Sequence, residues 1–504
     1  MPVRLSVTSR ATAVVLAAVG AAAIIGALLV AEDGAGSVGQ DRPVNVGATD
    51  LGDISAHNSP TIVRNPRDAK NLAVTSRVDS PDFTCALHVT RDGGTRWTRI
   101  PVPIPAGEGR KCFAPDAAFG PDGTLYVSWV TLKGAGNRPH AAWVATSTDA
   151  ARTLHPPRRV GGPLTFGVRI TADPGRSGRV YMTWLQARDV GLLKFSGPGN
   201  PILIRRSDDG GVTWSRPAQV NAASRGRVLG ASPVVGPRGE LYVLFLDVGD
   251  DRLDYEGGHL GDGGPPYPGH FSLVVARSLD RGATWQESVV DDAVVPTRRF
   301  ISFLPPFPSL AVDPASGRLY VAFEDARRGA PDVYVWSLAR GSREWSKPVR
   351  VNDTPPGDRS WQYLPRAAVA PGGRLDVVYY DRRADPANIR NQVALQSSED
   401  GGASFGPRLI LSTRAFDSRI GAGGERGLPD LGSRLGLVSS DDAATAAWTD
   451  TRNGTEGSNK QNIFSAVVTF ERAGQTWRTI LLLGGIVLVL VAVGALVSAR
   501  VRNN

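Results

Sequence analysis

A short signature that recurs along the chain constrains its fold more than any other feature. The pattern Ser/Thr-x-Asp-x-Gly-x-Thr-Trp occurs, with few changes, at Thr90–Trp97, Ser207–Trp214, Ser278–Trp285 and Ser398–Phe405. Degenerate copies begin at Ser147 and Ser337, so the copies are spaced by roughly 60 residues. A repeat of this kind predicts a chain built from several copies of one small structural unit.

Each residue type in this signature has a local structural role. The Asp and Ser/Thr side chains hydrogen-bond to nearby backbone in a tight turn, and Gly accepts the strained dihedral angles. The aromatic residue at the end packs between strands. The signature is therefore a structural device, and we assign it no catalytic role.

The segments around each signature have the pattern of β-strands. Large residues alternate with smaller ones in four related segments, Leu125–Trp129, Val180–Trp184, Leu241–Phe245 and Leu319–Phe323. This period of two is typical of a strand. Another strand precedes each of these, as at Pro308–Pro314, and one follows the signature, as at Arg216–Asn221. With the strand that enters the signature, we expect four strands per repeat.

The signature resembles the Asp box of the sialidase-like (BNR-repeat) β-propellers, in a membrane-anchored bacterial form, over residues 42–470. The resemblance implies an all-β propeller. First strands begin near residues 60, 115, 168, 231, 308, 365 and 433, which predicts seven blades. The seventh repeat lacks a fourth strand, and Arg42–Val46 resembles one, so we expect this segment to close the ring. Catalytic sialidases have six blades, so a six-bladed ring is the alternative.

Two hydrophobic runs flank the repeats. Ala11–Ala31 and Thr479–Ala499 are uncharged and about 20 residues long, enough to cross a bilayer core of roughly 30 Å. Their basic flanks predict a propeller on the extracytoplasmic side of the cell membrane. The other segments are then a cytoplasmic N-terminus at 1–10, linkers at 32–41 and 471–478, and a cytoplasmic tail at 500–504. A cleaved signal peptide is the alternative for the first run, although its apolar stretch exceeds the usual length.

The charge and the cysteines narrow the choice of partners and compartment. The formal net charge is +9, but no Lys/Arg block or aromatic-interleaved basic helix occurs, which argues against nucleic acid. The charge favours an anionic ligand, such as an acidic glycan. The only two cysteines, Cys85 and Cys112, fall in neighbouring repeats. Outside the cytoplasm we expect them to form a disulfide, the alternative being two unpaired thiols.

The first strands of a propeller line its channel, and their second positions predict a site at the channel mouth. These positions hold Thr61, Asp116, Arg169, Ser232, Ser309, Arg366 and Arg434. They lie on the face that carries the long irregular loops, where sites usually form. A guanidinium binds a carboxylate through two contacts, so Arg169, Arg366 and Arg434 are the candidate ligand-binding residues. The structural alternative is that these arginines neutralise loop carboxylates such as Asp381 and Asp450.

The resemblance also implies a catalytic set. Sialidases use an arginine triad for the sugar carboxylate, an Asp acid and a Tyr–Glu nucleophilic pair. Asp116 would be the acid, and Glu324 and Tyr380, at equivalent strand ends in adjacent blades, would form the pair. Val168–Ile170 lacks the aromatic residue and the proline of the family's arginine motif, which weakens the enzymatic reading.

Other polar clusters have structural explanations. Acidic and basic residues recur together after the second strand, at Asp325–Arg327, Asp381–Arg383 and Asp450–Arg452. Repetition in several blades indicates an Asp–Arg brace. The acidic loop Asp247–Glu256 is a candidate Ca²⁺ site because Ca²⁺ takes several carboxylate oxygens, the alternative being solvated carboxylates. The six histidines show no metal-ligand spacing, so we expect no other metal or cofactor.

Three functions remain open at this point. The sequence favours a cell-surface propeller that binds an acidic glycan or another carboxylate ligand at its channel mouth. A retaining, exo-sialidase-like glycoside hydrolase is the enzymatic alternative. A platform for protein partners in the cell envelope, using the long loops, is the third.

Overall fold

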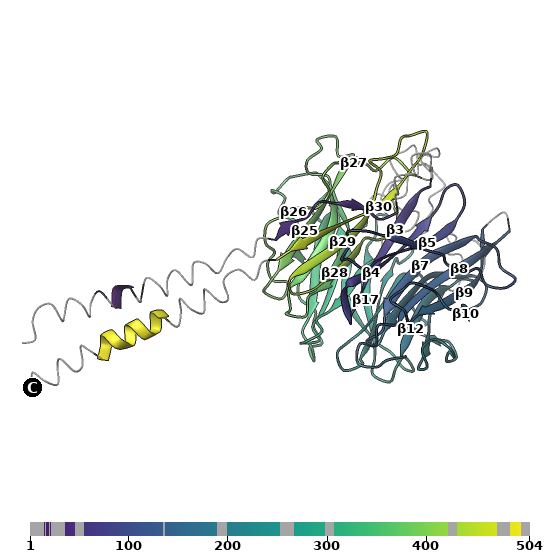
Figure 1. Ribbon diagram of the computed structural model, residues 1–504, viewed down its shortest axis with the longest axis horizontal. Helices are drawn as coiled ribbons and strands as arrows, with labels where there is room; N and C mark the ends of the chain where they lie inside the picture. The colour runs from purple at the N-terminus through teal and green to yellow at the C-terminus, as the bar shows by residue number, and fades with distance from the viewer. Residues whose placement is uncertain are drawn as a thin grey trace, which may run out of the picture. The chain divides into compact units, whose positions relative to one another are not determined.

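The computed structural model describes residues 15, 17–19, 21, 36–45, 55–134, 137–188, 199–251, 267–297, 307–421, 431–470 and 484–494. Within them the chain forms seven antiparallel sheets of four strands, two of which carry one extra short strand (Figure 1). The first strand of every sheet lies against the first strands of both neighbouring sheets, so the sheets are blades around one axis. The predicted seven-bladed, all-β propeller is confirmed, and the six-bladed alternative is wrong.

Blades one to four follow one another along the chain, and each begins with its innermost strand. The first two comprise β3 (His57–Asn65), β4 (Asp68–Val78), β5 (Thr84–Thr90) and β6 (Thr98–Ile100), then β7 (Cys112–Phe119), β8 (Leu125–Lys133), β9 (Arg138–Ser147) and β10 (Arg158–Gly161). The next two comprise β11 (Thr165–Ala172), β12 (Val180–Gln186), β13 (Ile202–Ser207) and β14 (Ala218–Gln219), then β15 (Val228–Val235), β16 (Leu241–Asp247), β17 (Phe271–Ser278) and β18 (Gln286–Val294).

Blades five and six repeat this order, and blade seven departs from it. The regular pair comprises β19 (Ser309–Val312), β20 (Leu319–Asp325), β21 (Asp332–Leu338) and β22 (Val349–Arg350), then β23 (Gln362–Val369), β24 (Leu375–Asp381), β25 (Arg390–Ser398) and β26 (Leu409–Ile410), with β27 (Phe416–Asp417) also on β25. Blade seven comprises β28 (Gly436–Ser439), β29 (Ala443–Asp450), β30 (Asn462–Thr469), β1 (Ser37–Val38) and β2 (Arg42–Pro43).

The outer strand of blade seven comes from the N-terminal side of the ring, as predicted. Arg42 on β2 pairs with Ser465 on β30. Beyond β2, the Val44 N–H donates to the Ile463 carbonyl at 2.7 Å, and Asn45 Oδ1 accepts from the Ile463 N–H at 2.6 Å. The closing segment is confirmed over residues 42–45, while residue 46 lies outside the described residues. Two distant parts of the sequence therefore share one sheet and seal the ring.

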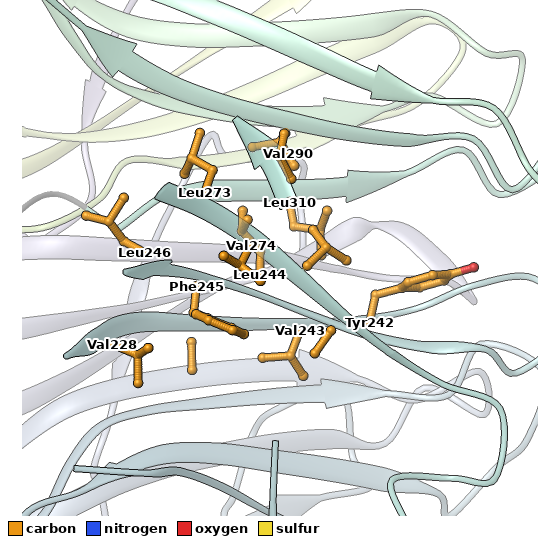
Figure 2. Packing of buried hydrophobic residues seen from close by; sticks show 14 of the residues in the cluster. Val228, Tyr242, Val243, Leu244, Phe245, Leu246, Leu273, Val274, Val290 and Leu310 are labelled. Atoms are coloured by element: carbon orange, nitrogen blue, oxygen red, sulfur yellow. The ribbon is translucent and has the colours of Figure 1, made fainter. Parts of the chain in front are cut away.

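The blades pack through both faces of their strands. On β16, Val243 and Phe245 point away from Leu244 and Leu246, so that each pair contacts a different neighbouring layer (Figure 2). All four side chains are fully buried. Burying one such side chain stabilises the fold by about 1.5–3 kcal/mol relative to exposure, so the alternating pattern provides much of the driving force for stacking blades.

The Asp boxes have the local structure that their residue types predict. In blade four, Ser278 Oγ donates to Asp280 Oδ1 at 2.8 Å, and the Gly282 N–H donates to Ser278 Oγ at 2.8 Å. The Thr284 N–H donates to the same Asp280 oxygen at 2.9 Å. Even the degenerate box in blade two keeps its carboxylate, Asp149, bound in the turn. The boxes are confirmed as structural turns.

Two further features complete the fold. Cys85 on β5 and Cys112 on β7 form a disulfide, with Cα atoms 5.7 Å apart, that joins blades one and two. By its contacts the chain divides into two units, residues 38–468 and residues 1–37 with 469–504. In the second unit the described helical residues are 15, 17–19, 21 and 484–494, and none of these helices has the length and hydropathy needed to span a bilayer.

Most of each predicted membrane segment lies outside the described residues. For the run Ala11–Ala31 only five residues are described, and for Thr479–Ala499 only 484–494. The predicted cytoplasmic ends at 1–10 and 500–504 and the linker 471–478 are outside them entirely, as are residues 32–35 of the predicted linker 32–41. Membrane anchoring therefore stays a prediction.

Candidate functional site

The candidate site is built from the seven innermost strands, which form a closed ring. β3, β7, β11, β15, β19, β23 and β28 each contact the first strand of the next blade, and β28 contacts β3. The seven predicted channel residues lie on these strands or, for Arg434, two residues before β28; they are Thr61, Asp116, Arg169, Ser232, Ser309, Arg366 and Arg434. Because equivalent positions of a ring surround its axis, chemistry carried by separate blades meets there.

A bulge in the backbone precedes most of these channel residues. The residue two positions earlier has a positive φ in six blades, at Ser59 (52°), Ala114 (51°), Gly167 (57°), Gly230 (72°), Leu364 (55°) and Gly432 (93°). The strand register shifts at the same place in five of them. Such a bulge bends the strand and changes the direction of the following side chain, and it is common next to binding sites.

Sequence reasoning missed this bulge, although part of the signal was present. Gly167, Gly230 and Gly432 each stand two residues before a channel position, as glycines that allow a left-handed backbone would. At Gly432 a Cβ atom would also lie 2.5 Å from the backbone nitrogen of Ser59, so no larger residue fits. In the other three of these six blades the same position holds Ser59, Ala114 and Leu364. These residue types rarely adopt a positive φ, so the sequence does not reveal the bulge there.

The small polar and acidic channel residues join neighbouring blades. Thr61 Oγ1 donates to Asp116 Oδ1 at 2.8 Å, and the Ile170 N–H donates to Asp116 Oδ2 at 2.9 Å. Blades one, two and three are thereby linked through a single carboxylate. In the same way, Ser309 Oγ accepts from the Ala367 N–H at 3.0 Å and links blades five and six. Asp116 is buried and serves as an acceptor in this network.

Arg434 belongs partly to the same network. Its Nε donates to Thr61 Oγ1 at 2.9 Å, and its Nη2 donates to the Pro115 carbonyl at 2.7 Å. Burial lowers the pKa of Arg434 well below its ordinary value, and repulsion from Arg169 and Arg366 lowers the pKa further. Arg434 is therefore a fixed positive charge held by neutral partners.

Arg169 and Arg366 lack such partners. Arg169 Nε lies 3.3 Å from Asp116 Oδ2, but its Nε and Nη1 atoms are buried and make no hydrogen bond to any described residue. Arg366 forms no hydrogen bond or ion pair with the described part of the chain. Its side chain is enclosed by the channel, although part of its surface stays accessible. Burial first, and then Arg169, lower the pKa of Arg366 to about 10.

The three predicted arginines thus come close enough to repel one another, and one carboxylate, Asp116, lies among them. This leaves an excess of two positive charges in a largely enclosed space. Such an arrangement is costly without an anion, because charges in a low-dielectric site repel strongly. Chemically, it can bind a carboxylate, a sulfate or a phosphate group.

The predicted Tyr–Glu pair is not assembled in this structure. Tyr380 is fully buried, donates to the Thr449 carbonyl at 2.9 Å and accepts from the Thr449 N–H at 3.1 Å. Glu324 instead accepts from Thr297 Oγ1 at 2.8 Å and from the Leu364 N–H at 2.6 Å. No hydrogen bond joins Tyr380 to Glu324, so the hydroxyl has no base to activate it.

Glu324 has another connection to the site. Leu364 is the left-handed residue two positions before Arg366, so the Glu324 carboxyl supports the bulge that precedes this arginine. Burial raises the pKa of Glu324 to about 7, while the hydrogen bonds from Leu364 and Thr297 oppose the shift. The hydrogen bond from the Leu364 N–H to Glu324 joins blades five and six, and the sequence around neither residue predicts it.

The Asp–Arg braces predicted from repetition are confirmed. Arg327 Nε donates to Asp325 at 2.7 Å, and Arg452 Nη2 lies 2.6 Å from Asp450. Asp381 pairs with Arg383 and with Arg408, at 3.3 and 2.6 Å. Asp381 and Asp450 are thus neutralised by their own braces. The channel arginines do not pair with them, contrary to the structural alternative.

The predicted Ca²⁺ site in the acidic loop Asp247–Glu256 stays a prediction, because the structure describes only residues 247–251 of this loop. Asp247 forms an ion pair with Arg225 at 2.9 Å, and Asp250 accepts a hydrogen bond from the Tyr267 hydroxyl. Asp254 and Glu256 lie outside the described residues. Over the described stretches of the chain, no group of three or more His, Cys, Asp or Glu side chains could hold a metal ion.

Fold and site together define a class: a seven-bladed β-propeller with an arginine-rich central channel. No protein-family model matches the chain, and no curated protein matches it in sequence. Among solved structures it is similar to a protein of unknown function from Dyadobacter fermentans (14% identity, 86% of this chain and 99% of that chain, TM-score 0.48). It is also similar to the Hadza microbial sialidase Hz136 (18%, 80% and 74%, TM-score 0.44) and to an α-L-arabinanase from Penicillium chrysogenum (14%, 74% and 96%, TM-score 0.43). At these values the similarity carries no argument about what this chain does.

Proposed function

We propose that this protein binds an acidic ligand, such as a glycan carrying a carboxylate, in its central channel. The observation that carries this proposal is the lack of hydrogen-bond partners on Arg169 and Arg366. Buried donors in folded proteins are nearly always paired, and exceptions often mark functional positions. A ligand carboxylate supplies the missing acceptors and the missing negative charge together.

The energetics favour a ligand with at least one full negative charge. A hydrogen bond to a charged group contributes about 1.5–3 kcal/mol, and a bidentate arginine–carboxylate contact forms two of them. Arg169 and Arg366 are the contacts with free donors, whereas Arg434 reinforces the positive potential from a fixed position. A neutral sugar gains none of the charge compensation, so we expect strong discrimination against it.

Binding without catalysis is the form of this function that the geometry supports best. Glycoside hydrolysis of the sialidase type needs a tyrosine hydroxyl activated by a neighbouring carboxylate. The Tyr380 hydroxyl instead bonds to the backbone of Thr449, and Glu324 supports the bulge before Arg366. We therefore favour an acidic-ligand receptor over an enzyme.

We further propose that the propeller is anchored in the cell membrane with its blades on the extracytoplasmic side. The hydrophobic runs and their basic flanks support this topology. So do the exposed apolar side chains of the helix at 484–494, which are Ile486, Val487, Leu490, Val491 and Val493. The disulfide is typical of an oxidising compartment. Protease added to intact cells should remove the propeller and spare tags on both termini; a protected propeller would contradict the topology.

A binding screen tests the proposed ligand class. The purified protein is exposed to acidic sugars such as glucuronate and N-acetylneuraminate and to neutral counterparts such as glucose. We expect the acidic sugars to bind and Arg366→Gln to weaken that binding by about 10-fold or more. Arg343→Gln removes an exposed arginine that is not on an innermost strand, and it should leave binding unchanged. Equal binding of neutral and acidic sugars would refute the proposal.

A further inference from the structure

A second pocket lies at the Asp-box end of blades three and four. It has a volume of about 320 Å³ and contains none of the seven channel residues. Its walls come from β13, from the turn and strand that follow it, and from the Asp box of blade four. The lining side chains used below are Tyr181, Ile204, Arg205, Arg206, Arg216 and Arg281.

The charged residues that line this pocket are all positive. Four of its lining residues are arginines, and none of the lining residues is acidic. Arg206 is neutralised by Asp208, whose carboxylate lies 2.8 Å away. Arg216 and Arg281 are exposed, and neither side chain has a hydrogen bond or an ion pair within the described structure. The pocket therefore has a positive potential available to a ligand.

Two donors inside the pocket are unsatisfied. Tyr181 is fully buried, yet its hydroxyl makes no hydrogen bond to any described residue. Arg205 donates through Nη1 to the Val160 carbonyl at 2.6 Å, but its Nε is buried without a partner. Burial lowers the pKa of Arg205, and no carboxylate opposes the shift. Buried donors without acceptors are costly, so an oxygen-bearing anion fits this place.

The remaining wall is apolar. Ile204, Pro217 and Ala218 line it, together with Gly282 of the blade-four Asp box. The volume matches the lower end of the range found for small-molecule sites, roughly 300–1,000 Å³. A ligand that fills this space combines an apolar body of about one ring with a negatively charged group.

We propose that this pocket binds a small organic anion with an apolar body, such as an aromatic carboxylate or phosphate. The anionic group contacts the exposed Arg216 and Arg281, and Arg205 adds positive charge to the wall of the pocket. The apolar body packs on Ile204, beside the Tyr181 hydroxyl. This site is independent of the proposed channel function, since it shares no residue with the channel.

Calorimetric titration of the full-length protein with phenyl phosphate tests the proposal. We expect saturable binding that is at least about 10-fold tighter than that of the neutral benzyl alcohol. The titration is repeated in the Arg366→Gln protein, which weakens any binding of the phosphate in the channel, and the binding in the pocket should persist. Loss of binding in Arg366→Gln would locate the phosphate in the channel and overturn the pocket proposal while supporting the channel.

Variants of the pocket complete the test. The double change Arg216→Gln and Arg281→Gln should weaken phenyl phosphate binding by about 10-fold or more, because two exposed charges are lost without disturbing the core. Arg96→Gln, in the blade-one Asp box, should have no effect. Unchanged affinity in the double variant, or no binding to the wild-type protein, would refute the site.

Discussion

At the scale of single residues, the channel arginines divide into two kinds. Arg434 donates hydrogen bonds to Thr61 and to the Pro115 carbonyl, so it belongs to the framework. Arg169 has buried donors without a hydrogen-bond partner, and Arg366 has no hydrogen bond or ion pair with a described residue and is repelled by Arg169. Stability and binding should therefore respond in opposite ways to substitutions at these positions.

This division gives a prediction for melting temperatures. Arg366→Gln should raise the melting temperature by about 1–3 °C, because one of three mutually repelling charges is removed, while acidic-ligand binding is weakened. Arg434→Ala should lower it by several degrees, because the Pro115 carbonyl loses its partner. Scanning calorimetry of both variants without ligand makes the measurement. A lower melting temperature for Arg366→Gln would mean that this residue supports the fold.

Glu324 gives a prediction for pH. Its pKa is near 4.5 in the unfolded chain and about 7 in the fold, because burial disfavours the charged form. Below pH 4.5 both states hold the proton; above it the unfolded chain releases the proton first. The free energy of unfolding should therefore fall as pH rises from 4.5 to 7, by about 3 kcal/mol in all.

Denaturant titrations across this pH range test the claim against Glu324→Gln. The variant keeps a neutral acceptor for the Leu364 N–H and should lose this fall in stability. Other titrating groups are common to both proteins and cancel in the difference. A difference between the two proteins that does not change with pH would show that folding does not raise the pKa of Glu324.

At the scale of elements, the Asp box is a turn whose carboxylate is stabilised by its own loop. Burial opposes ionisation of Asp209, but hydrogen bonds from Thr213 and Ser207 prevail and lower its pKa to about 2. This contribution to stability is complete above the unfolded pKa, near 4, and is lost as pH falls towards 2. Asp209→Asn should therefore lower the melting temperature at pH 6 more than at pH 2, as measured by scanning calorimetry.

In the degenerate box of blade two, we expect a substitution to stabilise the protein rather than destabilise it. Ala150 has a φ of 60° at a position where three of the four intact boxes have glycine and the fourth has Arg281. Because alanine is strained in this region, Ala150→Gly should stabilise the protein by about 1 kcal/mol in denaturant unfolding. Ala218→Gly on β14 is the control and should destabilise it, since glycine there only adds freedom to the unfolded chain. Destabilisation by Ala150→Gly would show that the turn is not strained.

The elements were predictable from sequence because their signals are local. Alternation marks the strands, and the Ser/Thr, Asp and Gly of each box bond within a few residues of one another. The bulges were not predictable, because Ser59, Ala114 and Leu364 adopt left-handed conformations that are rare for their residue types. The Tyr–Glu pair failed for a related reason. Repeat alignment gives equivalent strand positions, but Tyr380 is bound to the Thr449 backbone across the blade interface.

At the scale of the whole molecule, the ring of blades brings distant residues together. Arg169, Arg366 and Arg434 come from blades three, six and seven, and repeat alignment sufficed to predict their convergence. Repeat alignment could not predict which arginine lacks hydrogen-bond partners, because that depends on neighbours such as Thr61 and the Pro115 carbonyl. The same ring depends on β2, which covers the edge of β30.

A truncation tests this closure. A chain starting at residue 36 keeps β1 and β2 and should fold normally, whereas one starting at residue 46 exposes the edge of β30. The shorter chain should melt about 5–10 °C lower and form oligomers, because an open strand edge pairs with other chains. Calorimetry and size-exclusion chromatography measure both effects. Equal stability of the two chains would show that β2 does not seal the ring.

The central claim is that Arg169 and Arg366 bind the acidic group of a ligand. A crystal structure of the protein with an acidic sugar identified by the screen tests it most directly. The account predicts a carboxylate oxygen at about 2.7–2.9 Å from the guanidinium nitrogens of both residues, with Arg434 still on Thr61 and Pro115. A ligand bound elsewhere, with the channel arginines unchanged, would contradict it.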